Sequence, residues 1–106
     1  MAMKKFLNDP DNIVVELLEG LVTANGDKVA LSGSNLVVRA TPKSKDKVAL
    51  VTLGGSGHEP ALSGFVGEGM LDISVPGEVF AAPGPPRVVE ALKAASRDAG
   101  DRKSVV

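Results

Sequence analysis

The sequence has no cysteine, tryptophan or tyrosine, and only one histidine in 106 residues. Without cysteine the chain cannot form disulfide bonds, thiolate nucleophiles or cysteine-ligated zinc and iron–sulfur sites. One histidine cannot build an all-histidine metal centre, so we expect no metal ligands here. The net charge of −1, from 12 basic and 13 acidic side chains, argues against a nucleic-acid partner.

Long apolar runs are also missing. None approaches the roughly 20 residues that cross a bilayer, so we expect no membrane partner. Lys4 and Lys5 stand near the N-terminus, but the apolar core of a signal peptide does not follow them. Together with the absence of cysteine, this predicts a cytoplasmic location.

Glycine and proline, by contrast, are concentrated in one part of the chain. Residues 54–86 hold 8 of the 12 glycines, 5 of the 7 prolines and the single histidine, His58. Residues 48–86 contain no lysine or arginine. A phosphate-bearing ligand normally needs a nearby cation or metal, so this stretch is better suited to a neutral ligand with hydroxyl or carbonyl oxygens.

Outside the glycine turn, helix and strand patterns alternate, which predicts an α/β fold, a layered sheet with flanking helices. The predicted helices are 10–24 and 86–99, and the predicted strands are 35–40, 47–53 and 71–75. The second strand is almost wholly apolar and is expected to be central. Only a turn containing Pro42 separates it from the first strand, so we expect these two to be neighbours.

Several shorter features carry weaker expectations. A short helix is predicted after Pro60, and the segment Lys43–Lys47 is expected to be an exposed turn. Glu68 and Asp72 are expected to be solvated or capping acids, and Met70 is expected in the core.

The turn Gly54-Gly55-Ser56-Gly57-His58 follows the central strand, where ligands bind in open α/β sheets. Its glycines allow positive φ angles and leave backbone N–H groups open to a ligand. The turn matches no phosphate-binding or dinucleotide motif, and Leu62 breaks an H-E-x-x-H metal motif. We interpret Ser56 as a hydrogen-bonding group for the ligand, because no orienting acid supports a nucleophile.

Histidine is the side chain suited to proton transfer near neutral pH, which makes His58 the candidate catalytic residue. The alternative, which the sequence leaves open, is that His58 only caps the next helix or fills a polar turn.

With these residues in view, the chain resembles the substrate-binding K subunit of dihydroxyacetone kinase from about Lys4 to Gly100. The similarity is carried by GGSGHEPALSGFVGEGMLDISVPGEVFAAPGPP, by KKFLNDPDNIVVELLEGLV and by SNLVVRA. Family members more often have three glycines before the serine, and Leu53 replaces the first of them here. The resemblance implies the N-terminal part of a K-type domain at 1–100 and a divergent tail at 101–106.

The resemblance also implies a function, the phosphorylation of a small neutral ketose such as dihydroxyacetone (glycerone) at a terminal hydroxyl. Gly55, Ser56, Gly57 and His58 would bind the substrate, and His58 would accept the proton of the attacking hydroxyl. The resemblance implies no cofactor on this chain. ATP with magnesium, or a phosphorylated partner, would belong to a separate L subunit or domain. A homodimer is a further implied partner.

The family's later substrate-contacting residues have no counterpart here, so we expect a truncated chain that is inactive alone and whose sheet lacks strands. Two other interpretations stay open. The chain could be a non-catalytic α/β module that binds a small polyol or carbonyl compound, or a structural remnant with an exposed sheet edge.

Overall fold

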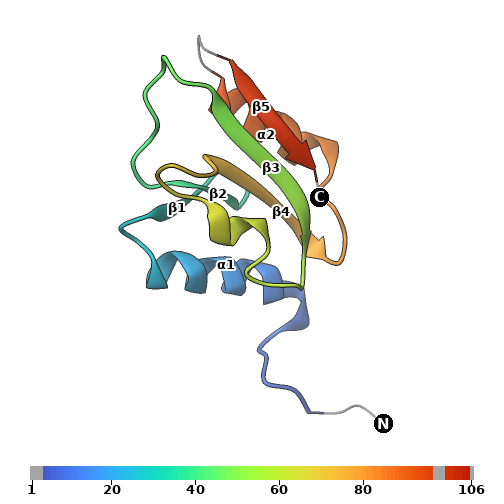
Figure 1. Cartoon of the computed structure of the whole chain (residues 1–106). Coiled ribbons are helices and arrows are strands. Elements are labelled where there is room, and N and C mark those ends of the chain that lie inside the picture. Colours follow the sequence, from blue (N-terminus) through green and yellow to red (C-terminus); the bar gives the residue numbers. More distant parts are fainter. Residues whose placement is uncertain (1–3, 97–99, 106) are drawn as a thin grey trace.

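A computed structural model gives the fold and describes residues 4–96 and 100–105. One five-stranded sheet, in the order β1-β2-β4-β3-β5, carries helices on both faces (Figure 1). The elements are η1 (Pro10–Asn12), α1 (Ile13–Ala24), β1 (Val29–Ser32), β2 (Leu36–Arg39), β3 (Ala49–Ser56), η2 (Leu62–Phe65), β4 (Ile73–Val79), α2 (Pro85–Ala95) and β5 (Asp101–Val105). None of the helices in the described ranges is long and apolar enough to cross a membrane.

The sheet is mixed, which confirms the predicted α/β class. The strands β1, β2 and β4 pair antiparallel, whereas β4, β3 and β5 pair parallel. The apolar strand β3 is central, as predicted, but it does not neighbour β2 because β4 lies between them. The prediction of adjacency is wrong because residues 40–48 are not a tight hairpin turn, and they carry the chain past β4 before β3 begins.

Strand β1 is absent from the sequence prediction. It forms a hairpin with β2, and the turn between them places Gly33 and Asn35 at positive φ angles of 54° and 63°. Glycine and asparagine tolerate this conformation better than other residues. The Ser-Gly-Ser-Asn sequence that follows Val29–Leu31 was the available signal for this hairpin.

Strand β5 corrects the expectation that the sheet lacks a strand after the last helix. Asp101–Val105 pairs parallel with β3, in a register that aligns Ala49 with Asp101 and Leu53 with Val105. Charged residues in its first half hid this strand from a search for apolar runs. Edge strands tolerate such residues, and charge there discourages further strand pairing.

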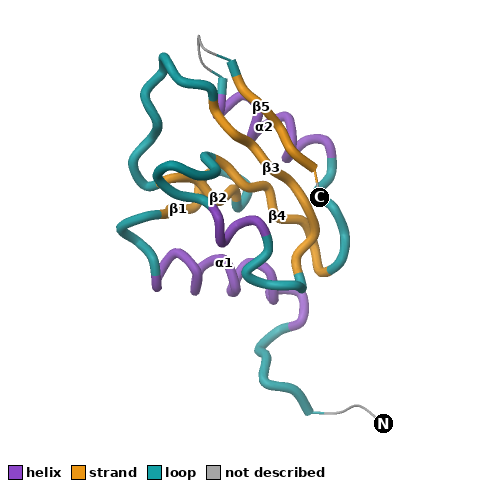
Figure 2. Tube along the Cα trace, in the orientation of Figure 1, coloured by secondary structure: helices purple, strands orange, loops and turns teal. Residues whose placement is uncertain are grey.

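The two faces of the sheet have separate apolar cores. Helix α2 packs on one face, around Leu36, Ala49, Val51, Ile73, Val75, Ala91 and Ala95. Helix α1 packs on the other, around Val14, Leu18, Val29, Val37 and Val66. The short turn η2 lies on the same side of the sheet as α1 (Figure 2). Odd-numbered side chains of β3 and β4 therefore face α2, and even-numbered ones face η2.

Both predicted helices are confirmed, with changes at their ends. The first begins as the turn η1, where the Asp9 carboxylate accepts a hydrogen bond from the Asp11 N–H at 2.9 Å. The second begins at Pro85 and ends at Ala95, before the predicted stop at Gly100; residues 97–99 lie outside the described ranges. Val89, in the middle of this helix, is 47% exposed.

Arg87 fixes the start of α2 to the sheet. Its Nε donates to the Ser34 carbonyl at 3.0 Å and its Nη2 to the Asn35 carbonyl at 3.3 Å. Its Nη1 donates to the Pro76 carbonyl in β4. Three carbonyls from two distant segments are thus held by one guanidinium, whose planar group of donors suits such a cluster. This anchors the carboxyl half of β4, where the candidate site lies.

Candidate functional site

The glycine turn lies where the sequence places it, at the carboxyl ends of the parallel strands β3 and β4. Its first three residues belong to strand β3, however, because β3 stays paired with β4 through Gly54↔Pro76 and, after a register shift, Ser56↔Val79. The shift is a bulge, which turns the end of β3 out of the regular ladder. Gly57 and His58 follow as the exposed part of the turn.

Two of the glycines are required by close packing within the protein. A Cβ on Gly55 would lie 2.9 Å from the Ala81 nitrogen, and one on Gly77 would lie 2.1 Å from the Ala81 carbonyl oxygen. Gly57 has a φ of +106°, which side-chain-bearing residues rarely adopt. Its N–H donates to the Glu59 carboxylate at 2.8 Å, so this amide already has a partner. These glycines are therefore needed for packing and backbone conformation within the protein, in addition to any role in binding a ligand.

Ser56 is buried, and its hydroxyl donates to the Gly77 carbonyl at 2.8 Å. This bond ties the end of β3 to β4. The hydroxyl hydrogen is therefore used inside the protein, and Ser56 is not among the residues that line the hollow beside His58.

His58 is exposed, and its imidazole stacks on the ring of Phe80 with the centroids 6.5 Å apart and the planes 15° from parallel. Ala61, not His58, occupies the cap position of η2, and no side chain caps that turn. Among the residues that the structure describes, none hydrogen-bonds the imidazole. The capping role considered for His58 is therefore absent, and both ring nitrogens are open to a ligand.

A small hollow opens beside His58, with a volume of about 20 Å³. Gly54, Gly55, His58, Ala61, Leu62, Ser63, Ser74 and Pro76 line it. None of these lining residues is a lysine or arginine, in keeping with the charge pattern of the sequence. Ser63 and Ser74 were not predicted as site residues; their spacing along the chain gave no signal, because η2 and β4 bring them together only in the folded protein.

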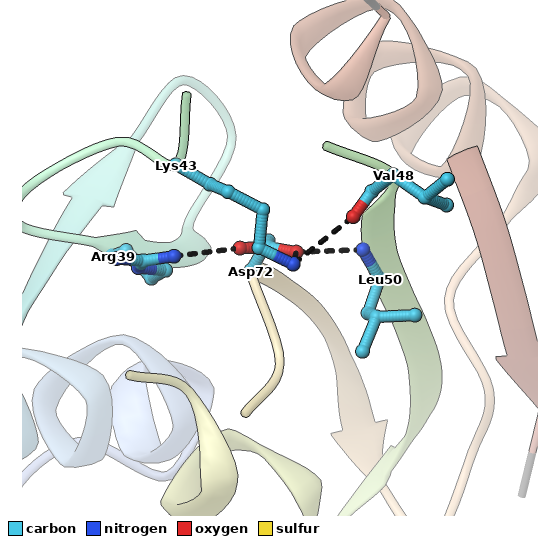
Figure 3. Close-up of polar contacts among 5 residues, drawn as sticks. All are labelled: Arg39, Lys43, Val48, Leu50 and Asp72. Carbon is cyan, nitrogen blue, oxygen red and sulfur yellow. Dashed lines mark hydrogen bonds and ion pairs between the residues drawn. The ribbon is translucent and has the colours of Figure 1, made fainter. Parts of the chain in front are cut away.

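At the amino end of strand β4, far from the glycine turn along that strand, an ion cluster surrounds Asp72 (Figure 3). Its carboxylate binds Arg39 at 3.2 Å and Lys43 at 2.9 Å, and it accepts a hydrogen bond from the Leu50 N–H at 2.7 Å. Lys43 also donates to the Val48 carbonyl at 3.0 Å. The expectation that Asp72 is solvated or capping is therefore wrong, because it is only 4% exposed.

The other predictions for nearby residues are confirmed in part. Glu68 is exposed, as predicted, and so is most of the Lys43–Lys47 turn. Met70, predicted in the core, is 49% exposed. It lies in the loop between η2 and β4, where no regular element turns its side chain inward.

The Asp72 cluster makes stability depend on pH. Burial, the largest single influence, raises the pKa of Asp72, but the Leu50 N–H, Lys43 and Arg39 together outweigh it and lower the pKa. The folded pKa thus lies below the unfolded value of about 3.9. The contribution of the ionised group is complete above the unfolded pKa and is lost as the pH falls through the folded pKa.

We therefore expect the urea midpoint of the wild type to fall as the pH drops below about 4, and the midpoint of Asp72→Asn to fall less. Urea titrations of both proteins at a series of pH values measure this difference. Equal pH dependence in the two proteins would show that the cluster does not carry the effect.

Within residues 4–96 and 100–105, no three histidine, aspartate or glutamate side chains are grouped to hold a metal ion. The hollow beside His58 also lacks the cation that a phosphate needs. A phosphoryl donor does not fit the residues present at this hollow.

The fold and the hollow define a class: an α/β protein with a small polar site at the carboxyl edge of two parallel strands. Comparison with known proteins gives the family. A model of the Dak1 domain matches residues 19–102, and the chain belongs to this family.

Relatives from several organisms support this membership. The chain is 46% identical, over 94% of its length, to the dihydroxyacetone-binding subunit of the PTS-dependent dihydroxyacetone kinase of Lactococcus lactis. It is 41% identical over 83% of its length to the corresponding subunit of the PEP-dependent kinase of Escherichia coli. It spans 30% and 25% of these two relatives.

Solved structures agree. The dihydroxyacetone kinase of C. freundii, solved with AMP-PNP and Mg²⁺, superposes with a TM-score of 0.88 at 36% identity. The match covers 96% of this chain and 20% of that one. The sequence-based resemblance to the K subunit, and to its N-terminal part, is confirmed.

Proposed function

We propose that this chain is the N-terminal, ketose-binding part of a dihydroxyacetone kinase subunit. The observation that carries the proposal is the open imidazole of His58, held against Phe80 at a polar, cation-free hollow on the carboxyl edge of the sheet. A neutral hydroxyketone suits such a hollow, because its oxygens need hydrogen bonds and not a counter-charge. The relatives named as dihydroxyacetone-binding subunits support the same ligand.

In this proposal His58 accepts the proton of the substrate hydroxyl as that oxygen attacks phosphorus. Removing the proton strengthens the nucleophile, and correct placement of the hydroxyl supplies much of the remaining rate. Gly55, which lines the hollow, and its neighbours Ser56 and Gly57 surround the substrate in this proposal. The Gly57 N–H would exchange the Glu59 carboxylate for a substrate oxygen, whereas the Ser56 hydroxyl stays bonded to the Gly77 carbonyl.

The phosphoryl donor comes from a partner in this proposal. Relatives named as PTS-dependent and PEP-dependent, and a neighbour solved with AMP-PNP and Mg²⁺, point to more than one kind of donor within the family. Because the chain spans about 30% of the first relatives, we propose that it supplies the ketose-binding turn and not the complete active site.

Binding of dihydroxyacetone tests the proposal, and His58→Ala is the variant to compare. We expect the amide resonances of Gly55–His58 in the wild type to shift when the ketose is added. We expect His58→Ala to bind it about 2- to 12-fold more weakly, the effect of one lost hydrogen bond. Lys45→Ala, which changes an exposed residue of the distant 43–47 turn, is the control and should bind as the wild type does.

The alternatives predict different results. A non-catalytic module for another small polyol would show ligand-induced thermal stabilisation that survives His58→Ala. A structural remnant would show no protected amides in 47–53 by hydrogen exchange. A folded wild type that binds no ketose at millimolar concentration would overturn the proposal.

A further inference from the structure

Three buried hydroxyl groups lie on the sheet face that carries η2, next to the hollow beside His58. Thr52, Ser63 and Ser74 are 1%, 4% and 3% exposed. Thr52 and Ser74 are paired positions on the neighbouring strands β3 and β4, and Ser63 reaches Ser74 from η2. The odd-numbered neighbours Val51, Ile73 and Val75 face α2, so the side chains of Thr52 and Ser74 point to the opposite face.

Hydrogen bonding in this group is incomplete. The hydroxyls of Ser63 and Ser74 lie 3.0 Å apart and share one hydrogen bond, which uses one of their two hydrogens. The Thr52 hydroxyl has no hydrogen-bond partner among the described residues, although it is fully buried. Buried hydroxyls normally find partners, because an unsatisfied one loses its hydrogen bond to water without replacement.

Ser63 and Ser74 also line the hollow that His58 lines. It has room for one water molecule or one hydroxyl group between its walls, and because it opens to solvent the rest of a small ligand can lie at its mouth. Ala61, Leu62 and Pro76 supply apolar walls around these polar groups. The hollow thus has the size and chemistry for a single hydroxyl-bearing carbon.

We propose that the Ser63–Ser74 pair is a subsite for one hydroxyl of a ligand that His58 binds through another polar group. This inference rests on the proposed function and adds to it a requirement on the ligand. The ligand must carry a second hydroxymethyl group, at the end that is not phosphorylated. The serine hydrogen that is not used between Ser63 and Ser74 is donated to this ligand hydroxyl. The ligand hydroxyl donates its own hydrogen to another oxygen near the hollow. In the absence of ligand, one water takes the same place.

The test compares two ligands that differ by one hydroxyl, dihydroxyacetone and hydroxyacetone. We expect the wild-type chain to bind dihydroxyacetone about 2- to 12-fold more tightly, the value of one hydrogen bond, as measured by NMR titration. Because either serine alone keeps one hydroxyl hydrogen for the ligand, we expect only the double variant Ser63→Ala/Ser74→Ala to bind both ketones with equal affinity. Ser96→Ala, at an exposed serine beyond the end of α2, is the matched control and should keep the preference.

The outcomes separate this inference from the proposed function. If the wild type binds both ketones equally, or if the double alanine variant keeps the preference, the subsite is wrong while the proposed function stands. If the wild type binds neither ketone, the proposed function fails and the subsite with it. Equal binding of the two ketones by the wild type would overturn the subsite without any variant, so the proposal remains testable even if the double alanine variant does not fold.

Discussion

Asp72→Ala is expected to lower the free energy of unfolding by about 3–5 kcal/mol, the usual cost of removing one partner of a buried ion cluster. The variant removes the carboxylate that Arg39 and Lys43 bind and the acceptor of the Leu50 N–H, at a position that is almost fully buried. Domains of this size are stable by roughly 5–15 kcal/mol, so the loss is a large share of the total. Urea denaturation followed by circular dichroism measures it.

Two variants calibrate this result. Glu68→Ala removes an exposed acid from the same part of the chain and should change the free energy of unfolding by less than about 0.5 kcal/mol. Asp72→Asn keeps an oxygen acceptor for the Leu50 N–H but loses the charge, so it should fall between wild type and Asp72→Ala. A urea midpoint for Asp72→Ala equal to that of the wild type would contradict the structural role of the cluster.

Gly77→Ala is the second substitution with a large expected effect. The added Cβ would lie 2.1 Å from the Ala81 oxygen and 2.7 Å from the Pro83 nitrogen, both backbone atoms that no side-chain rotation can move. The 80–83 loop would have to shift. We expect the free energy of unfolding to fall by about 3 kcal/mol, the upper part of the range for overpacking.

The same shift should reach the site, because the loop carries Phe80 and the Gly77 carbonyl accepts from Ser56. Gly67→Ala is the matched control, since a Cβ there meets nothing within 4 Å and its φ lies outside the left-handed region. Thermal unfolding of the two variants gives the comparison. Equal stability would show that the 80–83 loop does not pack on β4 as described.

Much of the fold follows from local patterns in the sequence. The helix predicted over 10–24 is found as η1 and α1, and the almost wholly apolar segment 47–53 predicts a central strand. The glycine turn was placed at the correct edge of the sheet because ligand sites in α/β proteins follow the carboxyl ends of parallel strands.

Most of the failed predictions share a physical cause, because they depend on contacts between distant parts of the chain. Nothing near Asp72 in the sequence shows that Arg39 and Lys43 will meet it, and nothing near Ser74 shows that Ser63 will. The pairing of β2 with β4 likewise joins segments that are far apart in the sequence, so local patterns do not predict it. Strand β5 was missed for another reason, because charge in an edge strand conceals the apolar pattern.

The stacking of His58 on Phe80 has a practical consequence. Protons of an imidazole that lies nearly parallel to a phenyl ring feel that ring's magnetic anisotropy, so their chemical shifts depend on the stacking geometry. The chain has a single histidine, and its carbon-bound ring protons therefore give one resolvable pair of signals without isotope labelling. Because there is only one histidine, the chemical shifts of its ring protons can be followed directly. A ligand that tilts the imidazole relative to Phe80 should change these shifts in a one-dimensional proton spectrum.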